Sequence, residues 1–335
     1  MVLQKKTFLL SLLLAASITV SGCGDAGQAD TGDASDAGQT TVAAVDQNDG
    51  SDAEQVEIED EIVALASVPS FASTQPSGTA TEKNNKAEID YSNTGDGYVM
   101  ARYTASTSAR LKVEIKGPTT RYTYNLPAGQ WVVFPLSDGN GSYQVTVYEN
   151  VKDTKYAMVL SKSMTVSLKD EFAPFLRPNQ YVDYASAPKT VAKAAELTKG
   201  KTDTLDKVQA VYDYVVGNVK YDKQLAASVR SGYLPVLDNI LATNKGICLD
   251  YAALMTGMLR SQNVPCKMVT GYTGGAYHAW ISVWSPEDGW IDGTIYFDGS
   301  KWQRMDPTFA SNGNQSEEIM KYIGDGKNYT VKYLY

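Results

Sequence analysis

The sequence predicts two folded regions, an all-β sandwich followed by an α+β region, behind an export signal and a tether. Three observations lead to this prediction. Short alternating segments separated by Gly, Asn and Asp recur in the middle of the chain, helical spacing follows, and alternation returns near the C-terminus. Alternation with a period of two is typical of strands, and spacing of three and four is typical of helices. A chain of 335 residues is long enough for two domains.

Residues 1–22 have the features of a lipoprotein signal peptide. Lys5 and Lys6 supply positive charge, and the apolar stretch from Phe8 to Val20 is too short to span a bilayer. Small residues then precede Cys23, a pattern that resembles a bacterial lipobox. We therefore expect Cys23 to be lipidated and to anchor the protein at the outer face of the cytoplasmic membrane. An ordinary secretory leader with an incidental cysteine is the alternative.

We predict that residues 23–85 form a disordered acidic tether. Between Gly24 and Glu61 there are eight Asp and four Glu, with no Lys or Arg. Such a composition cannot bury enough apolar surface to offset chain entropy. An acidic ligand surface is the alternative interpretation. Without these acids and the two leader lysines, residues 62–335 carry a net charge of about +2, against −8 for the whole chain. No basic stripe indicates a nucleic-acid partner.

Residues 86–170 are predicted to form an Ig-like β sandwich. Seven short segments alternate: Ala87–Ser92, Tyr98–Thr104, Leu111–Lys116, Tyr122–Leu126, Trp131–Leu136, Tyr143–Glu149 and Met158–Leu168. This number and spacing of strands is typical of sandwiches. The many tyrosines fit ordinary strand residues, and a carbohydrate-binding platform is the alternative.

Residues 171–335 are predicted to be the α+β region. Helices are expected at Pro188–Leu197, at Val208–Val219, at Leu234–Ala242 and from Cys248 onward. An antiparallel sheet is expected to follow, with strands at Lys267–Tyr272, Tyr277–Trp284, Trp290–Phe297, Lys301–Asp306 and Thr330–Tyr335. Asp298-Gly299 is a hairpin signal between two of these strands.

Three residues of this region form a candidate catalytic triad. Cys248 stands at the start of a helix, where the macrodipole favours a thiolate. His278 is the single histidine of the chain and lies on an alternating strand, and Asp306 ends the next strand before a proline. The chain then offers, in this order, a nucleophile, a general base and an acid that orients the base, which we call the orienter. Each residue also has a structural interpretation: a buried apolar cysteine, a core histidine and a turn-capping acid.

The pattern around these residues resembles the transglutaminase-like core, a branch of the papain-like cysteine enzymes. The resemblance rests on Gly246-x-Cys248-x-Asp250-Tyr251-Ala252, on Tyr277-His278-Ala279-Trp280 and on Asp306-Pro307-Thr308, and it covers roughly Leu205 to Phe309. It implies a papain-like fold in which Cys248 is the nucleophile, His278 the base and Asp306 the orienter. The family includes acyltransferases, peptidases, amidases and members without known activity, so it does not name the reaction.

We expect a surface-anchored hydrolase or acyltransferase that cleaves amide bonds of peptide, protein or cell-wall peptide through a thioester. The backbone N–H of Cys248 is a natural oxyanion donor, and Trp280 and Tyr221 are candidates for a second one. Asp292 and Asp298 are rival orienters. This chemistry requires no metal and no cofactor, and the oligomeric state is open.

The rival interpretation is a binding or scaffolding lipoprotein that keeps the fold without activity, and a third is a carbohydrate-binding surface protein. Cys266 is predicted to be structural, because a helix separates it from Cys248.

Overall fold

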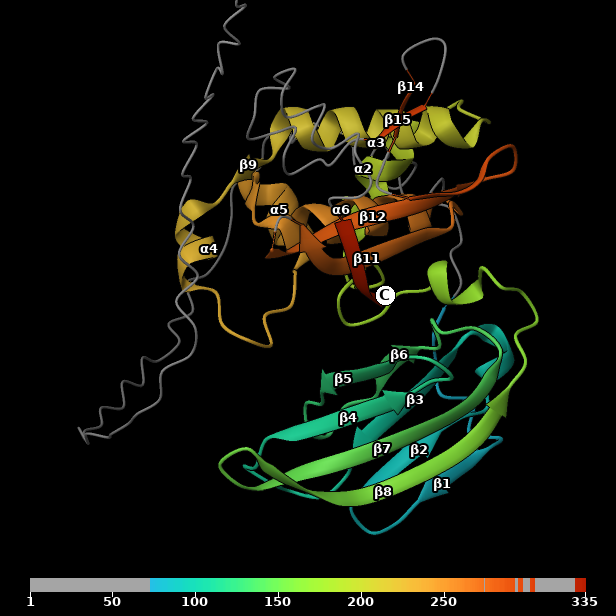
Figure 1. Ribbon diagram of the computed structural model, residues 1–335, viewed down its shortest axis with the longest axis vertical. Coiled ribbons are helices and arrows are strands. Elements are labelled where there is room, and N and C mark those ends of the chain that lie inside the picture. Colours follow the sequence, from blue (N-terminus) through green and yellow to red (C-terminus); the bar gives the residue numbers. More distant parts are fainter. Residues whose placement is uncertain (1–72, 274, 293–294, 298–301, 305–328) are drawn as a thin grey trace, which may run out of the picture. The chain divides into compact units, whose positions relative to one another are not determined.

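The computed structural model describes residues 73–335 except 274, 293–294, 298–301 and 305–328. Its β-rich part consists of two four-stranded antiparallel sheets (Figure 1). One sheet has the order β1-β2-β3-β6 and the other β5-β4-β7-β8. The strands are β1 (Thr81–Lys83), β2 (Ala87–Asp90), β3 (Tyr98–Tyr103), β4 (Leu111–Lys116), β5 (Arg121–Asn125), β6 (Val132–Pro135), β7 (Gly141–Lys152) and β8 (Lys155–Val166).

Side-chain alternation explains why these sheets bury one face. In β4, Leu111, Val113 and Ile115 are buried, while Lys112 and Glu114 between them are not. The buried faces of the two sheets contact each other, since the ring of Tyr124 on β5 lies 5.0 Å from that of Phe134 on β6. The β-rich part is therefore a sandwich, as predicted. Its assignment as Ig-like stays a prediction.

The first sheet begins earlier than the sequence predicted. Strand β1 falls inside the range 23–85 that we expected to be tether, and it pairs antiparallel with β2. Just before it, the Gly78 N–H donates to the Asp90 carboxylate at 2.6 Å, and the Ala80 N–H donates to Ser92 Oγ at 2.8 Å. A strand of three polar residues carries no hydrophobic alternation, so backbone pairing defines it and its side chains do not reveal it.

Among its described residues, the α+β part contains five α-helices and a four-stranded sheet. The helices are α2 (Pro188–Thr198), α3 (Thr204–Asn218), α4 (Lys223–Ser228), α5 (Leu237–Thr243) and α6 (Cys248–Ser261). The sheet has the order β13-β12-β11-β16, with β11 (Cys266–Thr273), β12 (Ala276–Ser285), β13 (Gly289–Asp292) and β16 (Tyr329–Leu334). Helix α6 is central: it packs against β11 and β12 as well as against α2, α3 and α5 (Figure 1). This part confirms the predicted α+β class.

One predicted strand of the sheet needs correction. The strand expected at Trp290–Phe297 is two strands, β13 and β14 (Ile295–Phe297), because β13 pairs with β12 whereas β14 pairs with β15 (Trp302–Arg304) in a separate ribbon. The hairpin signal Asp298-Gly299 lies outside the described residues. Helix α4 and the parallel pair formed by β9 (Lys220–Tyr221) and β10 (Lys245–Gly246) were not predicted, because they are too short for periodicity to show.

A buried arginine joins helix α6, the sheet and the segment 167–187 between β8 and α2, which we call the connector. Arg260 is fully buried, and it donates from Nε to the Cys266 carbonyl at 2.8 Å and from Nη1 to the Arg177 carbonyl at 2.7 Å. Its Nη2 donates to the Tyr335 carbonyl. Burial lowers the pKa of this guanidinium to about 10. The three carbonyl bonds replace the water that the cation loses on burial.

Among the described helices, none combines the length and apolarity that a bilayer crossing requires.

Candidate active site

Cys248 is the first residue of α6, as the sequence predicted. The preceding Ile247 is in the extended conformation and ends the loop, and the half-buried Cys248 thiol is free. The first turn of a helix carries the positive end of its dipole and backbone N–H groups that point out of the helix. This position therefore favours an oxyanion that develops beside Cys248.

Backbone pairing holds the turn that precedes Cys248. Gly246 stands opposite Tyr221 in the parallel pair β9–β10, and the Asp222 N–H donates to the Gly246 carbonyl at 2.9 Å. From inside α6, the Tyr251 hydroxyl donates to the Val219 carbonyl at 2.7 Å. The turn that presents the sulfur is thus paired with β9, and the helix that it opens is bonded to Val219, the C-cap of α3. We refer to residues Gly246–Cys248 as the nucleophile turn.

The carboxylate of Asp250 completes this arrangement. It is fully buried, and it accepts hydrogen bonds from the Ile247 N–H and from the Tyr233 hydroxyl, both at 2.8 Å. Burial raises the pKa of Asp250, and these two bonds oppose the shift. The sequence did not predict a role for Asp250 or Tyr233. An acid at the third position of a helix was the available signal for Asp250, whereas Tyr233 comes from a loop without a pattern.

Tyr221 lies close to the thiol. Burial is the main cause that raises the pKa of the Tyr221 phenol, and its electrostatic interaction with Cys248 is the next. Its position opposite Gly246 in the β9–β10 pair accounts for this proximity. Its role as an oxyanion donor stays a prediction, since the position of a bound substrate would decide it.

His278 is the third residue of β12 and is 6 % exposed. Its ring lies 6.2 Å from the Trp280 ring with an interplanar angle of 21°. On the neighbouring strand its partner is Gly271, where a Cβ atom would stand 2.0 Å from the Thr330 carbonyl oxygen and 2.8 Å from the Trp280 ring. Because α6 packs against β12, the elements that carry Cys248 and His278 are in contact.

The acid of the predicted triad, Asp306, lies outside the described residues, as do Asp298 and the lipidation candidate Cys23. The rival orienter Asp292 is occupied elsewhere. It accepts a hydrogen bond from Ser282 Oγ at 2.9 Å, and Ser282 is four residues beyond His278 on β12, a distance of roughly 13 Å along a strand. Asp292 is therefore too far along the sheet to orient the His278 ring.

Cys266 is structural, as predicted. It is fully buried at the start of β11, its Sγ lies 3.6 Å from Thr256 Oγ1, and it is a free thiol. Burial raises its pKa to about 11, so it stays protonated at neutral pH.

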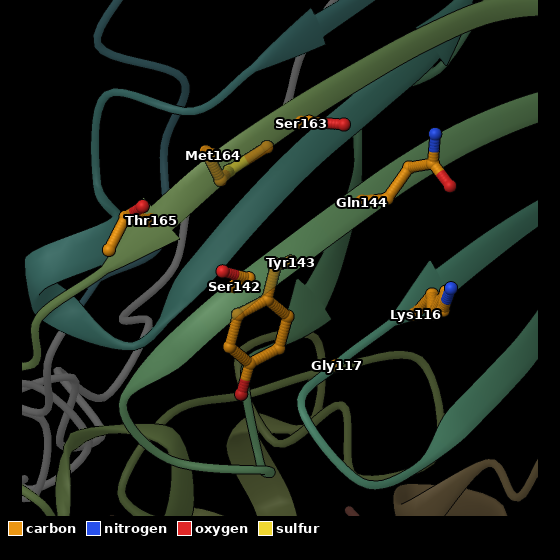
Figure 2. Close-up of a pocket in the computed structure, with 8 residues that line it drawn as sticks. All are labelled: Lys116, Gly117, Ser142, Tyr143, Gln144, Ser163, Met164 and Thr165. Atoms are coloured by element: carbon orange, nitrogen blue, oxygen red, sulfur yellow. The ribbon is translucent and has the colours of Figure 1, made fainter.

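A depression of about 560 Å³ lies on the outer face of the sandwich, over the ends of β4, β7 and β8 (Figure 2). Polar side chains dominate its lining, among them Lys116, Gln144 and Ser163. Figure 2 shows these side chains standing on adjacent strands along one sheet face. None of the lining residues belongs to the candidate triad, and no nucleophile–base pair is formed there.

Part of the α+β region matches the model of a known protein family. Residues 191–307 match the model of the Transglutaminase-like superfamily, a range that contains Cys248, His278 and Asp306. The protein YebA of Bacillus subtilis (strain 168) is 29% identical over 117 residues, which cover 29% of this chain and 16% of YebA. A protein-glutamine gamma-glutamyltransferase of Pseudomonas aeruginosa is 34% identical over 68 residues, which cover 16% of this chain and 10% of that protein. The chain thus spans less than a fifth of the length of both relatives.

Among solved structures, red sea bream transglutaminase aligns with 68% of this chain and 53% of its own. The sequence identity is 12% and the TM-score 0.27.

Proposed function

We propose, from the transglutaminase-like domain that the chain carries at residues 191–307, that this protein is a cysteine-dependent hydrolase or acyltransferase acting on amide bonds. The observation that carries the proposal is that the matched range begins its central helix with a free, half-buried cysteine and packs that helix against the strand of the single histidine. A nucleophile on a helix N-terminus and a base on the adjoining strand are the elements of covalent acyl transfer.

The proposed reaction has two steps. In the first, the Cys248 sulfur attacks the carbonyl carbon, a C–S bond forms, and the C–N bond breaks while His278 delivers the thiol proton to the leaving amine. In the second, water or an amine attacks the thioester, His278 removes its proton, and the sulfur leaves as thiolate. Asp306 would accept from the other imidazole nitrogen and fix the tautomer. The Cys248 N–H would stabilise the oxyanion in both steps.

We propose a peptide, a protein or cell-wall peptide as the substrate, and hydrolysis in preference to cross-linking, because water is the abundant acceptor outside the cell. This rests on the lipobox-like sequence before Cys23, which would anchor the enzyme by lipid at the outer face of the membrane. A binding protein that keeps the fold without turnover is the second candidate. Its sequence would not need a cysteine on the helix N-terminus together with a histidine on the packed strand.

Acyl transfer to Cys248 is tested with an activated acyl ester, p-nitrophenyl acetate. The account predicts that the folded protein becomes acetylated at Cys248, that hydroxylamine reverses the modification, and that Cys248→Ser abolishes it. Peptide mapping by mass spectrometry locates the acetyl group, and the buried Cys266 serves as an internal control. Acetylation only after denaturation would favour the binding protein.

A further inference from the structure

The buried carboxylate of Asp250 lies in the first turn of α6 and contacts two residues of the nucleophile turn, Gly246 and Ile247. Asp250 is 0 % exposed, and its Oδ2 accepts the N–H of Ile247 at 2.8 Å. A Cβ atom placed on Gly246 would stand 2.5 Å from the Cβ of Asp250, so the side chain packs directly on the Gly246 backbone. The Asp250 side chain therefore fixes the two residues that immediately precede Cys248.

The second oxygen of this carboxylate holds a residue from a separate segment. Asp250 Oδ1 accepts the hydroxyl of Tyr233 at 2.8 Å, and Tyr233 lies in the segment 229–236 between α4 and α5. That segment is otherwise largely open to solvent, with Val236 63% exposed. The Tyr233–Asp250 bond ties this exposed segment to the helix that carries the nucleophile.

Three further groups surround the pair. The carboxylate of Asp222 interacts electrostatically with both Asp250 and Tyr233, and it accepts the Leu225 N–H at 2.8 Å as the N-cap of α4. The phenol of Tyr221 interacts electrostatically with Cys248, Tyr251 and Asp250, and the Tyr251 hydroxyl donates to the Val219 carbonyl. Asp250 thus stands among acids and phenols, and its two hydrogen bonds are what stabilise its charge.

We propose that Tyr233 and Asp250 are positioning residues for the nucleophile. The phenol holds the carboxylate, and the carboxylate holds the Ile247 amide and with it the backbone that presents the Cys248 sulfur and N–H. This inference rests on the proposed function, because it concerns the reactivity of Cys248. A role through charge alone makes the opposite prediction, since a carboxylate two residues from the sulfur would disfavour the thiolate.

Three substitutions distinguish a positioning role of Tyr233 and Asp250 from an effect of the Asp250 charge on Cys248. Tyr233→Phe removes one hydrogen bond and leaves the carboxylate in place. Asp250→Asn removes the charge, but its amide oxygen can accept from the Ile247 N–H while its NH₂ donates to the Tyr233 oxygen, so both bonds survive. Asp250→Ala removes the charge and both bonds. Tyr184→Phe is a matched control, because it also deletes one hydroxyl bond, to the Leu176 carbonyl at 2.6 Å, away from the nucleophile turn.

The measurement is the rate of Cys248 alkylation by iodoacetamide in the folded full-length protein between pH 5 and 9, followed by mass spectrometry of the Cys248 peptide. Positioning predicts that Tyr233→Phe and Asp250→Ala slow alkylation by roughly ten- to a hundredfold, as misplacement of a reactive group does. Asp250→Asn and Tyr184→Phe should stay within about twofold of the wild type. Thermal unfolding of each variant shows that it is folded, and Tyr233→Phe with Asp250→Asn suffices if Asp250→Ala does not fold.

Two results would overturn the inference. Wild-type rates in Tyr233→Phe would show that the phenol positions nothing, and equal, faster rates in Asp250→Asn and Asp250→Ala would show that only the charge acts. A wild-type Cys248 that resists alkylation while folded would instead refute the proposed function, and the positioning role with it. The alkylation rate of Cys248 in the wild type thus distinguishes failure of the proposed function from failure of the positioning role.

Discussion

At the scale of single residues, Arg260 shows how much one buried cation determines. It is fully buried, yet its three donors reach carbonyls of the connector, the start of β11 and the residue that follows β16. A cation loses its hydration when it is buried, so its stability depends on all of these acceptors. The sequence did not predict this residue, because an arginine in a helix is usually exposed and no local pattern reveals three distant carbonyls.

Arg260→Lys should destabilise the protein by about 2–4 kcal/mol, although the charge is kept. A lysine ammonium is a point donor, whereas the three carbonyls need the planar guanidinium fork. The Arg177 and Cys266 carbonyls would then lose their hydrogen-bond donor. Each buried carbonyl left without a donor costs about 1–3 kcal/mol of stability. Denaturant unfolding measures the difference. A midpoint equal to that of the wild type would show that charge, and not geometry, is what this position requires.

At the scale of elements, the sequence predicted helices and strands well where side-chain periodicity is strong. The stripe Val208, Val211, Tyr212 and Val215 is buried on α3, and the sequence placed the start of α6 at Cys248 correctly. Strand β1 and the pair β9–β10 were missed, because backbone pairing and not apolar side chains defines them. The hydrogen bond that supports the candidate site was also missed, because it joins the side chain of a loop residue, Tyr233, to Asp250, 17 residues later on a helix, and no local pattern marks such a bond.

Gly246→Ala should distort the nucleophile turn. The new Cβ would stand 2.5 Å from the Cβ of Asp250, closer than real Cβ contacts, so the carboxylate or the backbone has to move. We expect a loss of stability of roughly 1–3 kcal/mol, as for other overpacked sites, together with slower alkylation of Cys248. Gly217→Ala on α3 is the matched control, because a Cβ there meets nothing within 4 Å. Equal stability and reactivity in the two variants would contradict the packing argument.

At the scale of the whole molecule, the sandwich and the α+β part contact each other through aromatic rings. Tyr122 of β5 lies 6.0 Å from Tyr335, and Tyr181 of the connector lies 4.5 Å from the same ring. The sequence predicted both parts but not this contact, since the tyrosines involved read as ordinary strand residues. The sequence also predicted a lipid anchor at Cys23 and a tether over residues 23–85; Cys23 and residues 23–72 lie outside the described part of the chain, whereas the end of the tether range contains β1.

Cys23→Ser should release the protein from the membrane or block its processing. The reason is that the cysteine sulfur is the expected acceptor of lipid, and each buried CH₂ of an acyl chain contributes about 0.8 kcal/mol to membrane binding. Fractionation of cells into membrane and medium, followed by immunoblotting, measures the outcome. Normal processing with unchanged membrane retention would refute lipid anchoring at Cys23.

The central claim is that Cys248 and His278 act together, and the pH dependence of Cys248 alkylation tests it most directly. An imidazolium beside the sulfur, added to the helix N-terminus, favours the thiolate. The account predicts that iodoacetamide alkylates Cys248 in the folded protein well below pH 8.5, roughly the midpoint of an unperturbed thiol. His278→Ala should move the profile toward that midpoint without unfolding the protein. An unchanged profile in His278→Ala, or alkylation of Cys248 only after denaturation, would contradict the claim.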